Sequence, residues 1–311
     1  MKKNNRIFCF GEVLWDEVNG EDVPGGAPLN VAYHIGKDDR FEVHLVSCIG
    51  DDAAGACMLS LIDGWSIDRQ FVQSTADYPT GRVVANVSDR NKVSYDILQP
   101  VAWDYINEDS ALSDCLHEDD CLVFGSLSCR NMKSRQTLFT LLSQKCFRIF
   151  DINLRGNYYD EETLSVLLEN TDLLKISDEE LVMVTRLFQP TMTTATEKEQ
   201  LRTLMSRFNI GAAIVTRGAD GASYYTTEGH WDVPGVRVAV VDTIGCGDAF
   251  LAAFLRYRLT GTSLETTLNN AMLTGAFIAR QKGGCPPYTL ADLETFISEK
   301  STGEFGRFSA H

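Results

Sequence analysis

The chain has 311 residues, of which 44% are hydrophobic and 23% charged, the composition of an ordinary globular protein. Its formal net charge of −15 argues against binding nucleic acid or an anionic membrane through bulk electrostatics, so any anion has to be attracted locally. We find no apolar run near the roughly 18 residues of a membrane span, and no features of a signal peptide at the start. We therefore expect a cytoplasmic protein.

Short apolar runs alternate with helical patterns along most of the chain. Continuous runs of this kind are typical of strands buried on both faces. Their alternation with helices predicts an α/β fold with a largely parallel central sheet and helices on both faces. The expected strands cover residues 7–10, 43–49, 121–127, 147–152, 172–176 and 212–216, and the expected helices cover residues 132–144, 161–168, 178–187 and 196–208. Such a sheet binds ligands at the carboxyl ends of its strands.

Residues 80–99 break this rhythm, because apolar and polar residues alternate there around a turn-like SDRN at 88–91. The pattern predicts a hairpin with one exposed face. We expect a single domain over residues 1–311 with a small antiparallel β lid, whose strands are inserted at about 12–24 and 80–100. An ordinary edge hairpin is the alternative interpretation.

The segment DTIGCGD at 242–248 carries the clearest chemical indication. Its glycines precede an apolar helical run, and free N–H groups at a helix start can cradle an anion. Asp248 could then accept the proton of an alcohol that attacks a phosphoryl group. Alternatively, Asp248 is only a first-turn acid that complements the helix dipole. Neither a Walker-type phosphate loop nor a dinucleotide fingerprint is present in the sequence, so the segment favours phosphoryl transfer to an alcohol.

This segment resembles the carboxyl-terminal motif of the ribokinase-like, or phosphofructokinase-B type, carbohydrate kinases. Segments in the family's order resemble its other motifs: GEVLWD at 11–16, GGAPLNVA at 25–32, DINLR at 151–155 and TRGADGA at 216–222. The likeness covers about residues 6–300. It implies a ribokinase-like fold and an ATP-dependent kinase that phosphorylates a sugar hydroxyl.

The resemblance also implies roles for the matched residues in catalysis and sugar binding. Asp248 would be the catalytic base, and Arg155 would face the transferred phosphate or the substrate. The anion hole would be formed by Gly245, Cys246 and Gly247, where the family usually has Ala in place of Cys246. The sugar hydroxyls would be bound by Asp16, Gly25, Gly26 and Asn30. Taken alone, Asp16 and Asn30 are also compatible with a turn acid and a helix-start amide, and Arg155 with a solvated ion pair.

The nucleotide and the metals are assigned in the same way. ATP would contact Lys175, Ser177, Thr216, Gly218, Gly221 and Asn270, although Asn270 also fits a surface asparagine. Glu180 would organise Mg²⁺ through water, and Asp242 with a loop near 281–285 would hold K⁺ if a monovalent cation is used. The segment KISDEE at 175–180 has Ser177 where the family usually has asparagine, a feature of fructokinase-like members.

The resemblance is strongest to fructokinases, so fructose is the expected substrate. Another sugar such as ribose, a sugar acid such as 2-keto-3-deoxygluconate, and a nucleoside remain alternatives, as does a non-catalytic sugar sensor on the same fold. Specificity would depend on side chains near the lid: Trp15, Tyr95, Ile97 and Trp103. The face that Val83, Ala85 and Val87 share could serve either the sugar pocket or a homodimer through the lid.

Overall fold

The computed structural model describes residues 6–18, 20–87, 93–192 and 194–303. Its main sheet has the strand order β13-β12-β11-β10-β9-β8-β1-β4-β5. The strands are β1 (Arg6–Phe10), β4 (Glu42–Gly50), β5 (Val72–Thr75), β8 (Cys121–Gly125), β9 (Phe147–Asp151), β10 (Leu173–Ser177), β11 (Ala212–Thr216), β12 (Ala222–Thr226) and β13 (His230–Val233). The pairings from β5 to β11 are parallel, and β12 and β13 continue the sheet antiparallel.

All six strands expected from the apolar runs are present, within one or two residues of the expected ends. The expected strand at 121–127 ends at Gly125, because Leu127 already belongs to the 3-10 helix η2 (Leu127–Cys129). The antiparallel edge formed by β12 and β13 was not expected. These strands follow β11 through short connections, which only an antiparallel pairing allows.

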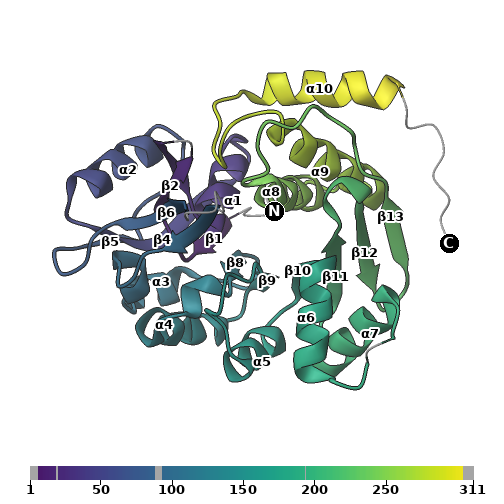
Figure 1. The fold of residues 1–311 in the computed structure, drawn as a ribbon, viewed down its shortest axis with the longest axis horizontal. Helices are drawn as coiled ribbons and strands as arrows, with labels where there is room; N and C mark the ends of the chain where they lie inside the picture. The colour runs from purple at the N-terminus through teal and green to yellow at the C-terminus, as the bar shows by residue number, and fades with distance from the viewer. Residues whose placement is uncertain (1–5, 19, 88–92, 193, 304–311) are drawn as a thin grey trace.

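Helices cover both faces of the sheet, as the alternating pattern predicts (Figure 1). One face carries α1 (Ala27–Ile35), α2 (Ala53–Asp63), α8 (Cys246–Leu259), α9 (Leu264–Ile278) and α10 (Leu290–Gly303). The other carries α3 (Ser110–Cys115), α4 (Met132–Leu142), α5 (Glu161–Glu169), α6 (Asp178–Phe188) and α7 (Glu197–Phe208). Strand β1 illustrates the division, since Ile7 and Cys9 pack on the first side and Phe8 and Phe10 on the second.

The lid is a second sheet with the order β3-β2-β6-β7. Its strands are β2 (Leu14–Val18), β3 (Glu21–Gly25), β6 (Gly81–Val87) and β7 (Val93–Ile97). The predicted purely antiparallel lid is wrong in one pairing, because β2 and β6 run parallel. Both strands follow the carboxyl ends of parallel main-sheet strands, β1 and β5, and therefore enter the lid in the same direction. The predicted turn at 88–91 lies outside the described residues, as do the side chains of Tyr95, Ala85 and Val87.

The carboxyl ends of β1, β8, β9, β10 and β11 meet at the same edge of the main sheet, because these strands are parallel. The segments GEVLWD, DINLR, KISDEE and TRGADGA all lie at these ends. Among the described residues, no helix combines the length and the apolar content needed to cross a membrane.

Candidate active site

The amino end of α8 forms an open backbone turn. Gly245 is its N-cap, with a φ of 75°, and a Cβ there would lie 2.5 Å from the Cα of Gly284, so a side chain does not fit. Gly247 in the first turn is exposed, while the run at 249–255 behind it is buried. The turn therefore presents backbone toward the outside and the helix dipole adds positive character. Burial raises the pKa of the Cys246 thiol to about 12, so this side chain is neutral.

Asp248 lies half-buried beside this turn. Its Oδ2 accepts a hydrogen bond of 2.8 Å from Nδ2 of Asn30, on α1. Burial raises the pKa of Asp248, while the charge of Lys175 and the hydrogen bond from Asn30 oppose the rise. A carboxylate with a raised pKa is a stronger proton acceptor, which suits a general base.

A buried ion pair lies under the same turn. The Nζ of Lys175, on β10, is 2.8 Å from each carboxylate oxygen of Asp151, on β9. A Cβ on Gly247 would be 3.3 Å from this Nζ, so the ammonium group lies directly behind the open backbone. Burial lowers the pKa of Lys175, but the charges of Asp151 and Asp248 outweigh it and raise the pKa overall. The turn is therefore backed by a permanent positive charge.

The residues predicted to bind the sugar lie where β2, β3 and α1 meet. A Cβ on Gly25 would collide with the carboxylate of Asp16, and a Cβ on Gly26, whose φ is 110°, would collide with the backbone oxygen of Glu12. Burial raises the pKa of Asp16 to about 6, although the charge of Arg155 lowers it. Two of the expected sugar-binding residues, Gly25 and Gly26, thus have to be glycine for steric reasons.

Glu12 is a site residue to which the sequence interpretation gave no role. It is 2% exposed, and its Oε1 accepts a hydrogen bond of 3.3 Å from the N–H of Ala27, at the start of α1. Its Oε2 has no hydrogen-bond partner among the described residues. Burial raises the pKa of Glu12 to about 7, with the charge of Asp248 contributing. The indication in the sequence was an acid directly after a buried strand.

The loop after β9 carries Arg155. This arginine is exposed, and its charge lowers the pKa values of Asp16 and Asp248. The loop is fixed by Glu180, whose Oε1 accepts from the N–H of Leu154 at 2.8 Å and whose Oε2 accepts from the N–H and hydroxyl of Ser177 at 2.9 Å. Ser177 and Glu180 form the capping box of α6. Both residues thus have structural contacts that the sequence interpretation did not include.

The remaining nucleotide-binding predictions fall on separate elements. Thr216 ends β11 and is in register with Ser177. Gly218 and Gly221 flank the turn after β11 with φ values of 53° and 111°, and a Cβ on Gly221 would collide with the backbone oxygen of Val233. Asn270 lies on α9, where its backbone oxygen accepts from Thr274. Among the contacts of the described residues, none joins Asn270 to the others.

Asp242 connects the segment before α8 to a later loop. Its Oδ2 accepts from the N–H of Gly283 at 2.9 Å, and its Oδ1 accepts from the N–H of Ile244 at 3.0 Å. The loop is also held from α1, because the buried His34 lies 2.9 Å from the backbone oxygen of Gly284 through Nε2. Burial lowers the pKa of His34 to about 3, so the ring is neutral and donates this hydrogen bond.

Within the described residues, no group of three or more His, Cys, Asp or Glu side chains is arranged to hold a metal ion. Mg²⁺ in kinases commonly uses one or two carboxylates together with the phosphates of the nucleotide. Asp151 and Glu180 raise the pKa of Lys175 through their charge and so lie on the same side of the site. Both carboxylates already accept hydrogen bonds from the protein, so a metal here would be held mainly by ATP.

The profile of the pfkB family carbohydrate kinases matches residues 2–290. The chain belongs to this family. It is an ATP-dependent carbohydrate kinase with a ribokinase-like α/β fold, which confirms the family, enzyme and fold predictions.

Two curated relatives of this kinase have different substrates in their names. Aminoimidazole riboside kinase from Salmonella typhimurium is 25% identical, over 98% of both chains, and fructokinase from Escherichia coli is 27% identical, over 84% of this chain and 86% of that protein. A double mutant of fructokinase from Vibrio cholerae O395, solved with fructose, ADP and potassium, is 26% identical. It has a TM-score of 0.80 and covers 94% of this chain and 98% of that one. The kinase is therefore a sugar kinase of a family with several substrates.

Proposed function

We propose that this kinase transfers the γ-phosphoryl group of ATP to a hydroxyl of fructose. The observation that carries the proposal is the position of Asp248, half-buried beside an open turn that is backed by the ammonium group of Lys175. Fructose is supported by the fructokinases among the relatives and by the fructokinase-like KISDEE segment. A riboside is the second candidate, since the riboside kinase matches over 98% of both chains.

In the proposed reaction, Asp248 removes the proton of the sugar hydroxyl. The hydroxyl oxygen then forms a bond to the γ-phosphorus, the bond to the bridging oxygen breaks, and ADP leaves. The N–H groups of Gly245, Cys246 and Gly247, together with Lys175 and Arg155, stabilise the charge on the transferred group. Glu180, acting through water, would help the nucleotide to hold Mg²⁺, and the ion would supply further neutralising charge.

Each ligand has its own set of residues in the proposal. The sugar is bound by Asp16, Gly25, Gly26 and Asn30. The nucleotide is bound by Lys175, Ser177, Thr216, Gly218, Gly221 and Asn270. Asp242 and the loop at 281–285 would hold K⁺, an ion that is present in the solved structure of the Vibrio cholerae fructokinase variant.

Residues 1–311 act as one kinase domain in this proposal, and the lid closes over the sugar. Closure excludes water, which strengthens the electrostatics and suppresses ATP hydrolysis. We further propose that the kinase acts in the cytoplasm and forms a homodimer through the exposed face of the lid.

Release of ADP across a panel of sugars, sugar acids and nucleosides tests the substrate. We expect the highest kcat/KM with fructose. A higher value with aminoimidazole riboside or 2-keto-3-deoxygluconate would replace fructose with that compound. ATP binding without ADP release with any alcohol would favour the sensor.

The variant Asp248→Asn tests the base, with an expected loss in kcat of about a hundredfold or more. The matched control is Asp178→Asn, which neutralises an exposed first-turn acid of α6. If Asp248 is only a first-turn acid that complements the helix dipole, both variants will keep the kcat of the unmodified protein, and the proposed base is wrong.

A further inference from the structure

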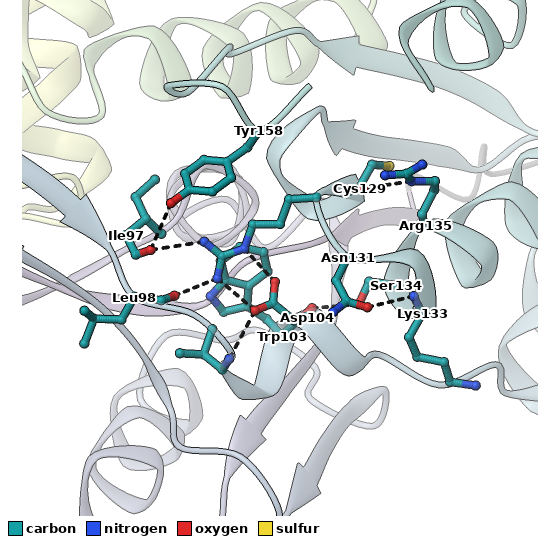
Figure 2. A network of polar contacts seen from close by, with 12 residues as sticks. Ile97, Leu98, Trp103, Asp104, Cys129, Asn131, Lys133, Ser134, Arg135 and Tyr158 are labelled. Carbon is teal, nitrogen blue, oxygen red and sulfur yellow. Dashed lines mark hydrogen bonds and ion pairs between the residues drawn. The ribbon is translucent and has the colours of Figure 1, made fainter. Parts of the chain in front are cut away.

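A polar network lies at the base of the lid, and none of its residues was assigned to catalysis or to binding of the nucleotide or a metal (Figure 2). We call it the lid-base network and define it by the side chains of Trp103, Asp104, Arg130 and Tyr158 and the backbone oxygens of Ile97 and Leu98. Trp103 and Asp104 come from the 3-10 helix η1 (Ala102–Tyr105), and Arg130 follows η2 at the carboxyl end of β8.

Arg130 and Asp104 form the centre of the network as a buried, two-pronged ion pair. Nε of Arg130 is 2.6 Å from Oδ1 of Asp104 and Nη2 is 2.8 Å from Oδ2, and both side chains are 2% exposed. The guanidinium carbon also lies 3.9 Å from the centre of a Trp103 ring. A buried ion pair adds little stability compared with apolar residues of the same size. Its planar fork does fix the directions of several partners at once.

The network contacts the lid at two points, the start of β6 and the end of β7. Arg130 donates to the backbone oxygens of Leu98, at 2.7 Å, and Ile97, at 3.3 Å, where β7 leaves the lid. A Cβ on Gly81, where β6 begins, would lie 2.5 Å from Nε1 of Trp103. The indole of Trp103 therefore fills the space behind that strand start, while Arg130 holds the strand end.

The same network reaches the loop that carries Arg155. The hydroxyl of Tyr158 is 3.4 Å from the backbone oxygen of Ile97, and its ring centre is 5.1 Å from the guanidinium carbon of Arg130. The N–H of Tyr158 donates to the backbone oxygen of Arg155 at 3.1 Å. Tyr158 thus closes a short turn that begins at Arg155, and its side chain fixes that turn to the end of β7.

We propose that Arg130 is a positioning residue that couples the placement of the lid to the placement of Arg155. While Arg130 donates to the end of β7, Tyr158 contacts both Arg130 and the backbone of Ile97. The turn that starts at Arg155 then keeps a fixed orientation toward the site. Movement of the lid strands then changes the position of Arg155. The inference rests on the proposed function in one respect, namely that Arg155 acts on the transferred phosphoryl group.

Amide hydrogen exchange of the free protein tests the coupling without any substrate. Arg130→Lys keeps the charge but loses the fork, and loss of one charge-assisted hydrogen bond shifts a local equilibrium about tenfold or more. We expect exchange to accelerate by that factor in β6, in β7 and in the turn at 155–158 together. The matched control is Arg256→Lys, since Arg256 forms a buried pair with Asp38 on the α8 side, with side chains 5% and 3% exposed.

Acceleration only in the lid, or equally in both variants, would overturn the proposal. Tyr158→Phe provides a second variant with little risk to folding, because it removes only the weak hydroxyl contact. It should accelerate exchange in the same two segments to a smaller extent, and an unchanged turn at 155–158 would count against the coupling.

Kinetics of the active kinase give a separate measurement. If Arg130 acts through Arg155, the losses in kcat from Arg130→Lys and Arg155→Gln are not multiplicative, and the double variant is no slower than Arg155→Gln alone. Multiplicative losses would show that the two arginines act independently. If the unmodified protein phosphorylates no sugar, the proposed function fails, whereas the exchange measurement still decides this inference.

Discussion

Neutralising Asp151 should destabilise the folded kinase, because the buried Lys175 charge behind the first turn of α8 loses its partner. In Asp151→Asn the shape of the side chain is kept, but the two 2.8 Å contacts to the Lys175 ammonium lose their charge. Lys175 is 7% exposed, so water cannot replace the lost partner. Asp248 and Glu180 are the other carboxylates whose charges raise the pKa of Lys175.

The cost follows from leaving a buried charge without its partner, about 3–5 kcal/mol. In large domains 1 kcal/mol corresponds to about 2–4 °C in Tm, so the variant should melt on the order of 10 °C lower. Calorimetry or thermal unfolding followed by circular dichroism measures this directly. The control is the double variant Asp151→Leu with Lys175→Met, which removes both charges and should recover most of the lost Tm, although not kcat.

A decrease in Tm of less than about 2 °C for Asp151→Asn would refute this reasoning, because it would mean that Lys175 is solvated or neutral in the folded state. A double variant less stable than the single one would also contradict it. Recovery of kcat in the double variant would remove Lys175 from the proposed stabilisation of the phosphoryl group.

Three further predictions concern neighbouring residues. Glu12→Gln should raise the free energy of unfolding at pH 8 by on the order of 2 kcal/mol but not at pH 5. Because burial raises the pKa of Glu12 to about 7, the unmodified protein loses stability as the pH rises toward that value. The glutamine of the variant does not titrate, so the variant does not lose this stability. Equal effects at the two pH values in urea titrations would contradict this. Gly245→Ala should abolish most activity, because the added Cβ would meet Gly284. Gly218 has a φ of 53° and open space around it, so Gly218→Ala should lower the free energy of unfolding by only about 1 kcal/mol. Equal melting temperatures for the two variants would argue against the steric reason. Asn30→Ala removes a hydrogen bond that lowers the pKa of Asp248, so the acid limb of kcat/KM should move to higher pH; an unchanged or lower midpoint in the pH profile would contradict it.

The main sheet was predictable because its signal is local. Runs such as residues 43–49 and 212–216 are apolar on both faces, and a strand buried between two helical layers requires this. The helices that begin at Ser177 and Thr196 carry capping boxes in the sequence itself. Pairing in the lid was less predictable, since the parallel contact of β2 with β6 depends on the direction in which distant strands leave the body.

The candidate site, too, has a part that the sequence predicted and a part that it could not. Resemblance identified the residues whose type is tied to a motif, such as Asn30 and Asp248, and the structure places their side chains 2.8 Å apart. The resemblance could not identify the residues that support and position the lid and the loops around the site. Arg130 and Asp104 lie 26 residues apart and belong to no motif, so only the fold reveals that they form an ion pair at the base of the lid.

The distribution of charge in the site explains how a chain with a net charge of −15 can use a polyanionic nucleotide. Carboxylates gather on the side of β2 and α1, where Glu12 and Asp16 have raised pKa values. Behind the turn of α8 lies the ammonium group of Lys175, 3.3 Å from where a Cβ on Gly247 would be. Asp248 lies between them: Asn30 donates a hydrogen bond to it from one side, and the charge of Lys175 on the other side partly offsets the rise in its pKa that burial causes. A phosphoryl group that approached from the carboxylate side would be repelled, so the charges themselves favour delivery of the phosphoryl group from the Lys175 side and of the uncharged hydroxyl from the other.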